Sequence, residues 1–134
     1  MPKLTFIIGA LILCAGGCKS ERAIEQIVRS ESPSATVSAR VLLDAYIANL
    51  IRADEKYKGR IIEVTGAVGN TGVEFPNTPY VMLNASDIGT GVQCFFSQEH
   101  KKAINALQAG MHVTIRGRCE GFNQGVRVEG CILE

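Results

Sequence analysis

The 134-residue sequence contains no tryptophan, and aromatic residues make up only 6% of it. It also lacks an excess of charge of either sign, since 14 Lys and Arg residues stand against 13 Asp and Glu residues. Proteins that bind nucleic acids usually carry a clear basic excess, because neutralising phosphates supplies much of their affinity. The charge balance therefore argues against a nucleic-acid ligand.

Motifs that carry catalysis or metal binding are also missing from the sequence. The five cysteines never occur at CxxC spacing, and the two histidines, His100 and His112, lie apart from them. Neither a phosphate-binding glycine loop nor a nucleophile with a nearby base can be identified. We therefore expect no enzyme activity, no metal site and no cofactor.

No apolar run is long enough for a membrane-spanning helix, which needs about 20 such residues. The apolar stretch from Leu4 to Ala15 is shorter, follows the positively charged Lys3 and leads through two glycines to Cys18. This layout is typical of a secretory signal that is removed at a small-residue site. Ala15-Gly16-Gly17-Cys18 also resembles the lipobox of bacterial lipoproteins, which implies cleavage before Cys18 and lipid on its sulfur.

The alternative is an ordinary signal peptide or an uncleaved anchor, in which Cys18 has no role. If Cys18 carries lipid, the several acyl chains of a mature lipoprotein provide a stable membrane anchor. The protein would then face the periplasm or the exterior of a bacterial cell envelope. Because Lys19 rather than aspartate follows Cys18, the resemblance favours the outer membrane if the cell is Gram-negative.

These features divide the chain into a signal peptide at 1–17, a lipidated cysteine and tether at 18–37, and a folded domain at 38–134. Removing the signal takes Lys3 from the 14 basic residues, so the mature chain has 13 basic and 13 acidic residues. Within the tether, apolar residues at helical spacing from Ser20 to Arg29 allow a short amphipathic helix. Such a helix could lie against the membrane, but we expect a flexible spacer.

Hydrophobic spacing predicts the elements of the folded domain. Steps of three and four residues after Ser38, a good N-cap, predict a helix to about Asp54 with Asn49 on its apolar stripe. From Arg60 the period changes to two, which predicts strands, and Gly66 predicts a bend or bulge in the first of them. In order we expect strands at 60–68, 80–85 and 91–96, a loop at 69–79, a helix at 98–108, strands at 111–119 and 125–133, and a turn at 120–124.

Five short strands with a helix between the third and fourth are the order of an OB-fold, a partly open Greek-key barrel. We therefore predict an all-β domain with added helices, namely a five-stranded OB-fold barrel with an extra N-terminal helix. The alternative is an open antiparallel sheet with helices on one face. The glycine-bent first strand, the position of the second helix and the final hairpin favour the barrel.

Short motifs along this order add a family resemblance. They are Leu42-x-x-x-Tyr46-x-x-Asn49, Ala53-Asp54-x-x-Tyr57-Lys58-Gly59-Arg60, Ile62-x-Val64-x-Gly66-x-Val68, Val92-x-Cys94-x-Phe96 and Val113-Thr114-Ile115-x-Gly117-x-Cys119-x-Gly121-Phe122. On these motifs, residues 38–134 resemble the tRNA_anti-like family of OB-fold proteins, which includes many bacterial lipoproteins. The strand motifs are generic to OB-folds, whereas the Ala-Asp-x-x-Tyr-Lys-Gly segment is more specific. The family name implies nucleic-acid binding only by analogy of fold.

OB-folds present ligands to the face of their second and third strands, flanked by the loops after the first and fourth strands. Aromatic and basic side chains on such a face bind single strands by stacking and charge. Seven residues are candidates for this ligand face: Phe75, Tyr80, Phe95, Arg116, Arg118, Phe122 and Arg127. The structural alternative is that Tyr80 and Phe122 cover the barrel ends and that the arginines are solvated.

A second polar group comprises Asn49, Asp54, Tyr57 and Lys58. We expect Asn49 to be buried and hydrogen-bonded. We expect Asp54 and Tyr57 to fix the turn from helix to strand, with a ligand or partner contact as the alternative.

Three cysteines, Cys94, Cys119 and Cys131, remain in the folded domain. In an exported, oxidising compartment one disulfide and one free thiol are plausible. A tight last hairpin would place Cys119 opposite Val128 and Cys131 opposite Arg116, so a bridge between these two cysteines would need a bulge. Cys94 with Cys131, and three buried free thiols, are the alternatives, so the pairing stays open.

The sequence thus predicts a membrane-anchored, extracytoplasmic OB-fold lipoprotein without catalytic activity. We expect it to act as a binding module for an envelope protein or another envelope ligand. Binding of single-stranded nucleic acid through the OB-fold face is the alternative hypothesis.

Overall fold

The computed structural model describes residues 20–134. The expected signal peptide at 1–17 and the expected lipidation site Cys18 lie outside the described residues. In chain order the structure contains α2 (Glu21–Ser30), β1 (Ala35–Ser38), α3 (Ala39–Ala48), α4 (Leu50–Tyr57), β2 (Ile61–Glu74), β3 (Thr78–Asn84), β4 (Gly91–Phe95), the 3-10 turn η1 (Gln98–His100), α5 (Lys101–Asn105), β5 (His112–Phe122) and β6 (Val126–Leu133).

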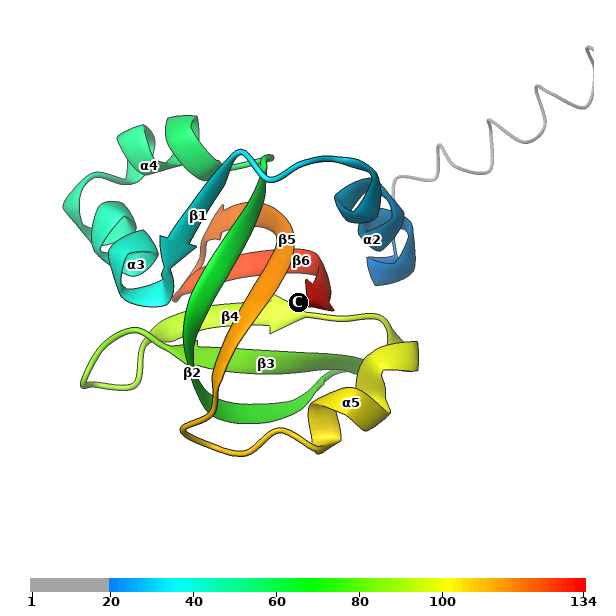
Figure 1. Cartoon of the computed structure of the whole chain (residues 1–134). Coiled ribbons are helices and arrows are strands. Elements are labelled where there is room, and N and C mark those ends of the chain that lie inside the picture. Colours follow the sequence, from blue (N-terminus) through cyan, green and yellow to red (C-terminus); the bar gives the residue numbers. More distant parts are fainter. Residues whose placement is uncertain (1–19) are drawn as a thin grey trace, which may run out of the picture.

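Strands β2 to β6 close into a barrel (Figure 1). They are hydrogen-bonded in the order β2-β3-β4-β6-β5, and a second pairing of β2 with β5 closes the ring. The pairs are antiparallel except for β4 with β6, and β1 adds in parallel to the first part of β2. With η1 and α5 between the third and fourth barrel strands, this is an OB-fold. The predicted barrel is confirmed, and the open sheet is excluded.

Strand β2 serves both halves of the barrel. Its first part pairs with β5 and its second part with β3, and the register shifts between Val68 and Asn70 where the partner changes. The irregularity predicted at Gly66 therefore lies at Gly69. At Gly66 an added Cβ would come 3.2 Å from the Cβ of Ala39, so this glycine makes room for the start of α3.

Two segments predicted as loops are largely strand. Strand β2 continues to Glu74 and β3 begins at Thr78, so only residues 75–77 form the turn. Strand β5 likewise continues to Phe122, which leaves a short turn at 123–125. The glycines, threonine and asparagine of these segments show no apolar alternation, but a projecting hairpin is held by backbone pairing and does not require it.

The barrel interior is filled by side chains from alternate strand positions, including Val64, Leu83 and Val128, and α3 and α4 close one end with Leu42 and Tyr46. As predicted, Ser38 caps α3, because its Oγ accepts a hydrogen bond from the Val41 amide at 3.1 Å. The chain between Ser38 and Tyr57 is two helices, and the single helix that we predicted is wrong.

Asn49 lies at the break between α3 and α4 and is exposed. Its side-chain oxygen accepts a hydrogen bond from the Arg52 amide at 3.0 Å and so caps α4. The expectation that Asn49 is buried was wrong, because asparagine can satisfy the free backbone amides of a new helix start and thereby interrupts the longer helix.

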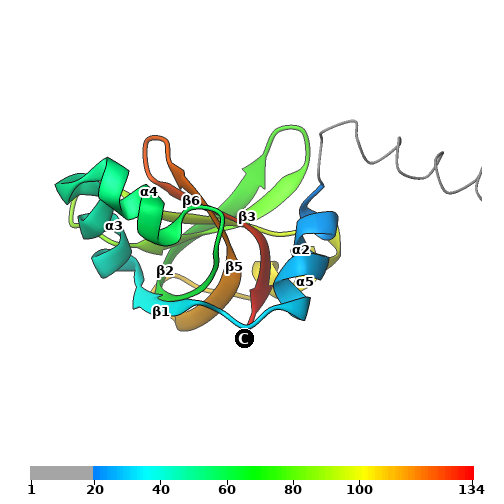
Figure 2. The same cartoon turned by 90° about the horizontal axis from the view of Figure 1, so that it is seen from above.

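Helix α2 is part of the folded domain, which corrects the flexible spacer expected at 19–37. Its buried side chains Ile24 and Val28 pack against Ile61 of β2 and Ile132 of β6. Figure 2 shows α2 against the barrel on the side away from α3 and α4. The amphipathic spacing of this segment indicated a helix, but the outer barrel surface that receives its apolar face exists only after the strands have paired.

A buried carboxylate also holds α2 in place. Glu25 is only 6% exposed. It bonds Arg29 of its own helix, with Nε at 2.8 Å, and accepts the Ser97 hydroxyl at 3.2 Å. It also lies 2.9 Å from Nε2 of His100 in η1. These bonds link α2 to the segment that follows β4.

Candidate ligand-binding face

The outer face of β3, β4 and β6 brings together three of the seven predicted ligand-face residues. Tyr80 of β3 and Phe95 of β4 are register partners with ring centroids 5.9 Å apart. The guanidinium carbon of Arg127, from β6, lies 4.0 Å from the centroid of the Phe95 ring. Strand alternation explains this grouping, because the neighbouring residues Val81, Cys94 and Val128 point into the core.

Phe95 is not available as a stacking surface. Its side chain is 0% exposed, although it points away from the barrel interior, because Tyr80 and Arg127 cover it. Tyr80 itself is half-buried and is the aromatic ring on this face that a ligand can reach. The cation–π contact of Arg127 thus covers Phe95 and leaves Tyr80 as the one accessible ring of this face.

The charge of Arg127 is already matched by carboxylates. Its Nη1 lies 3.4 Å from Glu74 at the end of β2, and its Nη2 lies 3.3 Å from Glu129. Burial alone would lower the pKa of Arg127, but the hydrogen bonds and charges of Glu74 and Glu129 outweigh it and raise the pKa. The guanidinium therefore stays protonated and is held across the face by two acidic partners.

Arg116 and Arg118 lie on β5, outside the β3–β4 face. Arg116 is paired with Glu134 at 3.2 Å and with Glu63 at 3.7 Å, and Arg118 with Glu120 at 2.6 Å. All three arginines that we predicted as ligand-face cations thus have acidic neighbours. The charges in this part of the chain are therefore balanced locally as well as in total.

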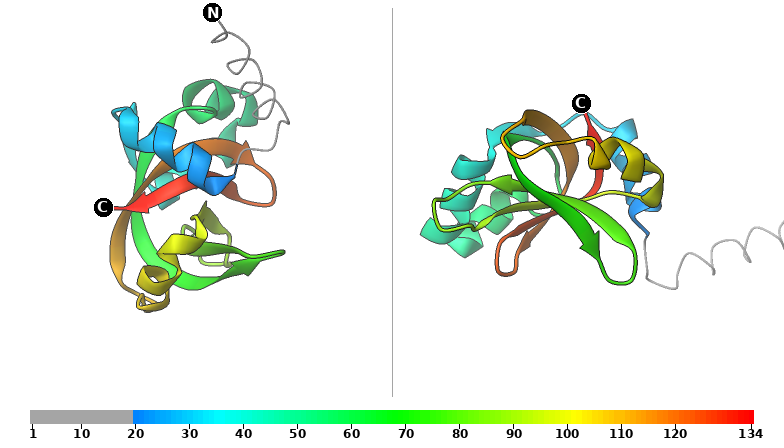
Figure 3. Two further views of the ribbon diagram at one scale, coloured as in Figure 1. Left: turned by 90° about the vertical axis from the view of Figure 1, so that its right-hand side faces the viewer. Right: turned by 90° about the horizontal axis from the view of Figure 1, so that it is seen from below.

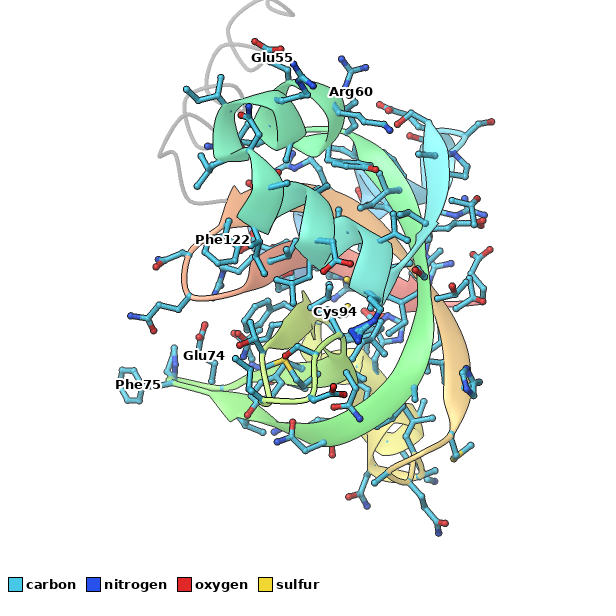
Figure 4. The ribbon with its side chains drawn as sticks, turned by 90° about the vertical axis from the view of Figure 1, so that its left-hand side faces the viewer. Glu55, Arg60, Glu74, Phe75, Cys94 and Phe122 are labelled. Carbon is cyan, nitrogen blue, oxygen red and sulfur yellow. The ribbon has the colours of Figure 1, made fainter. Side chains whose placement is uncertain are left out.

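The two remaining predicted aromatics, Phe75 and Phe122, lie apart from each other (Figure 4). Phe75 projects from the turn between β2 and β3 and is 91% exposed. Phe122 instead stacks on Tyr46 of α3, with ring centroids 6.1 Å apart and an interplanar angle of 18°. Phe122 therefore covers the end of the barrel, as the structural alternative for this residue proposed, and only Phe75 flanks the face.

One residue that shapes the face was missed in the sequence. Gly72 of β2 is the register partner of Tyr80, and an added Cβ there would come 2.7 Å from the Tyr80 hydroxyl oxygen. The missing side chain lets the tyrosine ring lie across β2. A glycine directly opposite an aromatic residue is a recognisable signal of two paired strands. We predicted a loop at 69–79, so the pairing of Gly72 with Tyr80 was not considered.

The polar group around Asp54 has a structural role in holding α4 against β5. The Lys58 amide donates to the Asp54 carbonyl at 3.0 Å, and the Gly59 amide donates to the Cys119 carbonyl at 2.8 Å. Tyr57 is buried beside Tyr46, whose pKa is raised by burial and by the neighbouring Cys119 thiol and Asp54 carboxylate. These contacts join the helix-to-strand segment to β5 and to the barrel core.

The three cysteines of the domain are free and buried in the structure. Cys119 lies opposite Val128, as predicted, and its Sγ is 3.7 Å from the Tyr46 hydroxyl. Cys131 is displaced by a register shift after Arg116, and its thiol faces Cys94. Burial, followed by the contact with Cys94, raises the pKa of Cys131 well above its ordinary value, which keeps this thiol protonated.

Within residues 20–134, no helix is long and apolar enough to cross a membrane. The same range contains no group of three or more His, Cys, Asp or Glu side chains placed to hold a metal ion.

Comparisons with known proteins agree with this architecture. The family model described as tRNA_anti-like matches residues 3–131. No curated protein matched the chain. A lipoprotein from Klebsiella pneumoniae, for which nucleic-acid binding has been suggested, has a similar structure with 16% identity, a TM-score of 0.59 and coverage of 81% of this chain and 96% of its own.

Weaker structural similarities were also found. An OBody bound to hen egg-white lysozyme is 20% identical, with a TM-score of 0.44 and coverage of 55% of this chain and 75% of its own. The yeast Stn1 and Ten1 structure is 13% identical, with a TM-score of 0.42 and coverage of 81% of this chain and 69% of its own.

Proposed function

The chain belongs to the tRNA_anti-like family, and we propose that it is a lipid-anchored binding module of the bacterial cell envelope. It binds an envelope protein or another envelope ligand through the outer face of β3 and β4. The module is not an enzyme. A single observation supports a protein-like ligand over an oligonucleotide. On this face Phe95 is covered, and Arg127 is already paired with Glu74 and Glu129.

The proposed location depends on the N-terminal sequence. The lipobox-like Ala15-Gly16-Gly17-Cys18 supports removal of the signal peptide and lipid on Cys18. Several acyl chains hold such a protein stably on a membrane. We further propose that the domain faces the periplasm or exterior, and that Lys19 directs it to the outer membrane in a Gram-negative cell.

A protein-like ligand suits the β3–β4 face better than an oligonucleotide does. Single-strand binders offer free aromatic faces and free cations along a groove. Here the accessible surface is the Tyr80 edge, bordered by a guanidinium that already has two carboxylate partners. Phosphates would have to displace these carboxylates, whereas a neutral or mixed-charge protein surface would not.

Oligonucleotide binding remains the second candidate function, because the family fold and the suggestion made for the Klebsiella lipoprotein both favour it. It predicts saturable binding that weakens steeply as salt increases. The two candidates therefore differ in a property that a single titration measures.

The test of the ligand class combines crosslinking with that titration. A photocrosslinking phenylalanine analogue replaces Tyr80 in the lipidated protein in cells, and the same analogue at Ile51, an exposed position on α4, is the control. We expect a discrete protein adduct from position 80, none from position 51, and loss of the adduct when Arg127→Glu repels Glu74 and Glu129. Absence of an adduct at position 80 contradicts the proposal.

In parallel, fluorescein-labelled single-stranded DNA and RNA are titrated with the fragment 19–134 at low salt, and anisotropy is measured. We expect no saturation. Saturable binding that salt reverses and that Arg127→Glu abolishes would establish the oligonucleotide function instead.

A further inference from the structure

The turn between β2 and β3 presents apolar side chains that the fold does not use. Phe75 is 91% exposed and Val73 is 53% exposed, and neither belongs to a core cluster. An aromatic residue at the tip of a projecting hairpin is costly to leave in water and serves best where a partner covers it. The position of the turn relative to α2 indicates which partner that is.

The start of α2 lies beside this turn. Ser20, Glu21 and Arg22 line one hollow together with Asn77 and Thr78, the residues that follow the turn. Figure 2 and the left view of Figure 3 show the first residues of α2 on the side of the barrel toward which the β2–β3 hairpin projects.

Helix α2 cannot move freely away from this position. Its apolar face is buried against the barrel through Ile24 and Val28, and Glu21 accepts a hydrogen bond from the Gly130 amide at 2.8 Å. Cys18 precedes Ser20 by two residues, so their Cα atoms lie within about 7.6 Å of each other. The proposed lipid attachment point is therefore tethered within two residues of Ser20, which lines the hollow beside the β2–β3 turn.

We propose that the β2–β3 turn, through Phe75 and Val73, inserts into the interfacial region of the lipid bilayer that holds the lipid on Cys18. The inference rests on the proposed lipidation. The acyl chains provide the affinity, and the turn fixes the orientation of the barrel, because aromatic rings are favoured at the level of the headgroups. The β3–β4 face then opens beside the membrane surface.

Charge on the neighbouring helix fits a bilayer with anionic headgroups. Lys101 and Lys102 of α5 line a hollow together with Val73, and Lys101 Nζ donates to the Asn77 side-chain oxygen at 2.8 Å. Among the ion pairs of residues 20–134, neither lysine has a carboxylate partner. Both ammonium groups can therefore face lipid phosphates.

The absence of tryptophan from the chain makes a direct test available. Phe75→Trp and Ile88→Trp each give a protein with one tryptophan, and Ile88 is a matched control because it is 87% exposed in the β3–β4 loop. The full-length lipidated variants are reconstituted into phosphatidylethanolamine and phosphatidylglycerol vesicles, with and without acyl-brominated lipid. We expect the emission of Phe75→Trp to shift to shorter wavelength and to lose most of its intensity to the bromolipid, and that of Ile88→Trp to do neither.

Uptake of labelled fatty acid is measured on the same preparations. Labelled protein whose Phe75→Trp emission is not quenched overturns the membrane-insertion proposal and leaves the anchor intact. Equal quenching of both variants also overturns it, because the turn would then have no special position. Absence of label on Cys18 overturns the anchor and the insertion together.

Discussion

Gly130, in β6, has a φ of +65° and lies directly beneath α2. An added Cβ would come 2.4 Å from Cγ2 of Ile24 and 2.8 Å from the backbone nitrogen of Glu25. The residue thus combines a left-handed backbone with close helix contact, and only glycine satisfies both. Its amide also donates a hydrogen bond to the Glu21 carboxylate, so this position controls how closely α2 approaches the barrel.

We therefore expect Gly130→Ala to loosen α2. The left-handed conformation and the overpacking against α2 together cost about 2–4 kcal/mol of the free energy of unfolding. Urea unfolding measures the loss, and hydrogen exchange locates it in the α2 amides. The matched control is Gly89→Ala, which has a φ of +90° but nothing within 4 Å of the added Cβ. Its cost should be limited to the backbone part, about 1–2 kcal/mol, with α2 exchange unchanged.

Helix α2 and the η1 segment are joined through the Glu25 carboxylate. Burial alone would raise the pKa of Glu25, but the hydrogen bonds from His100 and Arg29 outweigh burial and lower it from its ordinary value of 4.5. The ionised form is therefore favoured in the folded protein. Its stabilising contribution is present above pH 4.5 and is lost as the pH falls through the lower folded-state value.

The second prediction concerns the pH dependence of α2 docking. Glu25→Gln should lower stability by about 1–3 kcal/mol at neutral pH, because it removes a charged acceptor from three donors. The difference from the wild type should shrink as the pH falls below 4.5. Thermal unfolding from pH about 6 to about 3 measures it across the range in which free carboxyl groups titrate.

Two comparisons make this prediction specific to Glu25. Glu31→Gln, in an exposed residue directly after α2, should behave as the wild type at each pH. The pKa of Glu21 is raised by burial, so its titration acts with the opposite sign. That contribution is common to the wild type and Glu25→Gln and cancels in their difference. If the difference in stability between the wild type and Glu25→Gln stays constant down to the lowest pH, the negative charge of Glu25 does not stabilise the docking of α2.

The whole molecule has a balanced charge and two short turns, at 75–77 and 123–125, that project on the same side of the barrel (Figure 3). The OB-fold ligand face lies between these turns. Because α2 is docked against the barrel, the proposed anchor joins the domain through an ordered helix. In the proposed arrangement, the docked α2 brings the β2–β3 turn to the membrane, and the inserted turn fixes the orientation of the ligand face.

The anchor has a test at this scale. Cys18→Ser should leave an unprocessed precursor that takes up no labelled fatty acid, because serine has no thiol to receive lipid. Lys19→Asp should keep the fatty acid and move the protein from the outer to the inner membrane of a Gram-negative host. Metabolic labelling and membrane fractionation measure both, and normal processing of the serine variant would contradict lipidation.

The fold was largely predictable because strand period, helix position and glycine placement are local properties of the sequence. The barrel, the N-cap at Ser38 and the pairing of Cys119 with Val128 were all predicted. The break at Asn49 was not, because an asparagine on an apolar stripe can be either buried or a cap. The hairpin extensions of β2 and β5 were missed because they have no alternating apolar pattern.

The candidate ligand face was predictable only as a list of residues. Tyr80, Phe95 and Arg127 come together because their strands are neighbours, whereas Phe122 points to the barrel end. The carboxylates that neutralise Arg127 come from β2 and β6, more than fifty residues apart in the chain. The pairing with Glu74 depends on barrel closure and has no local signature, whereas Glu129 lies two residues from Arg127 on the same strand.

The sequence by itself determined the type of fold, the family motifs, the charge balance and the N-terminal segment that supports a lipid anchor, because each of these depends on residue type and spacing. The tertiary structure alone decided that α2 packs on the barrel, that Phe95 is covered and that Arg127 is paired with Glu74. The physical reason is that burial and ion pairing join residues distant in sequence. Their energies are set by the surfaces that meet when the barrel closes.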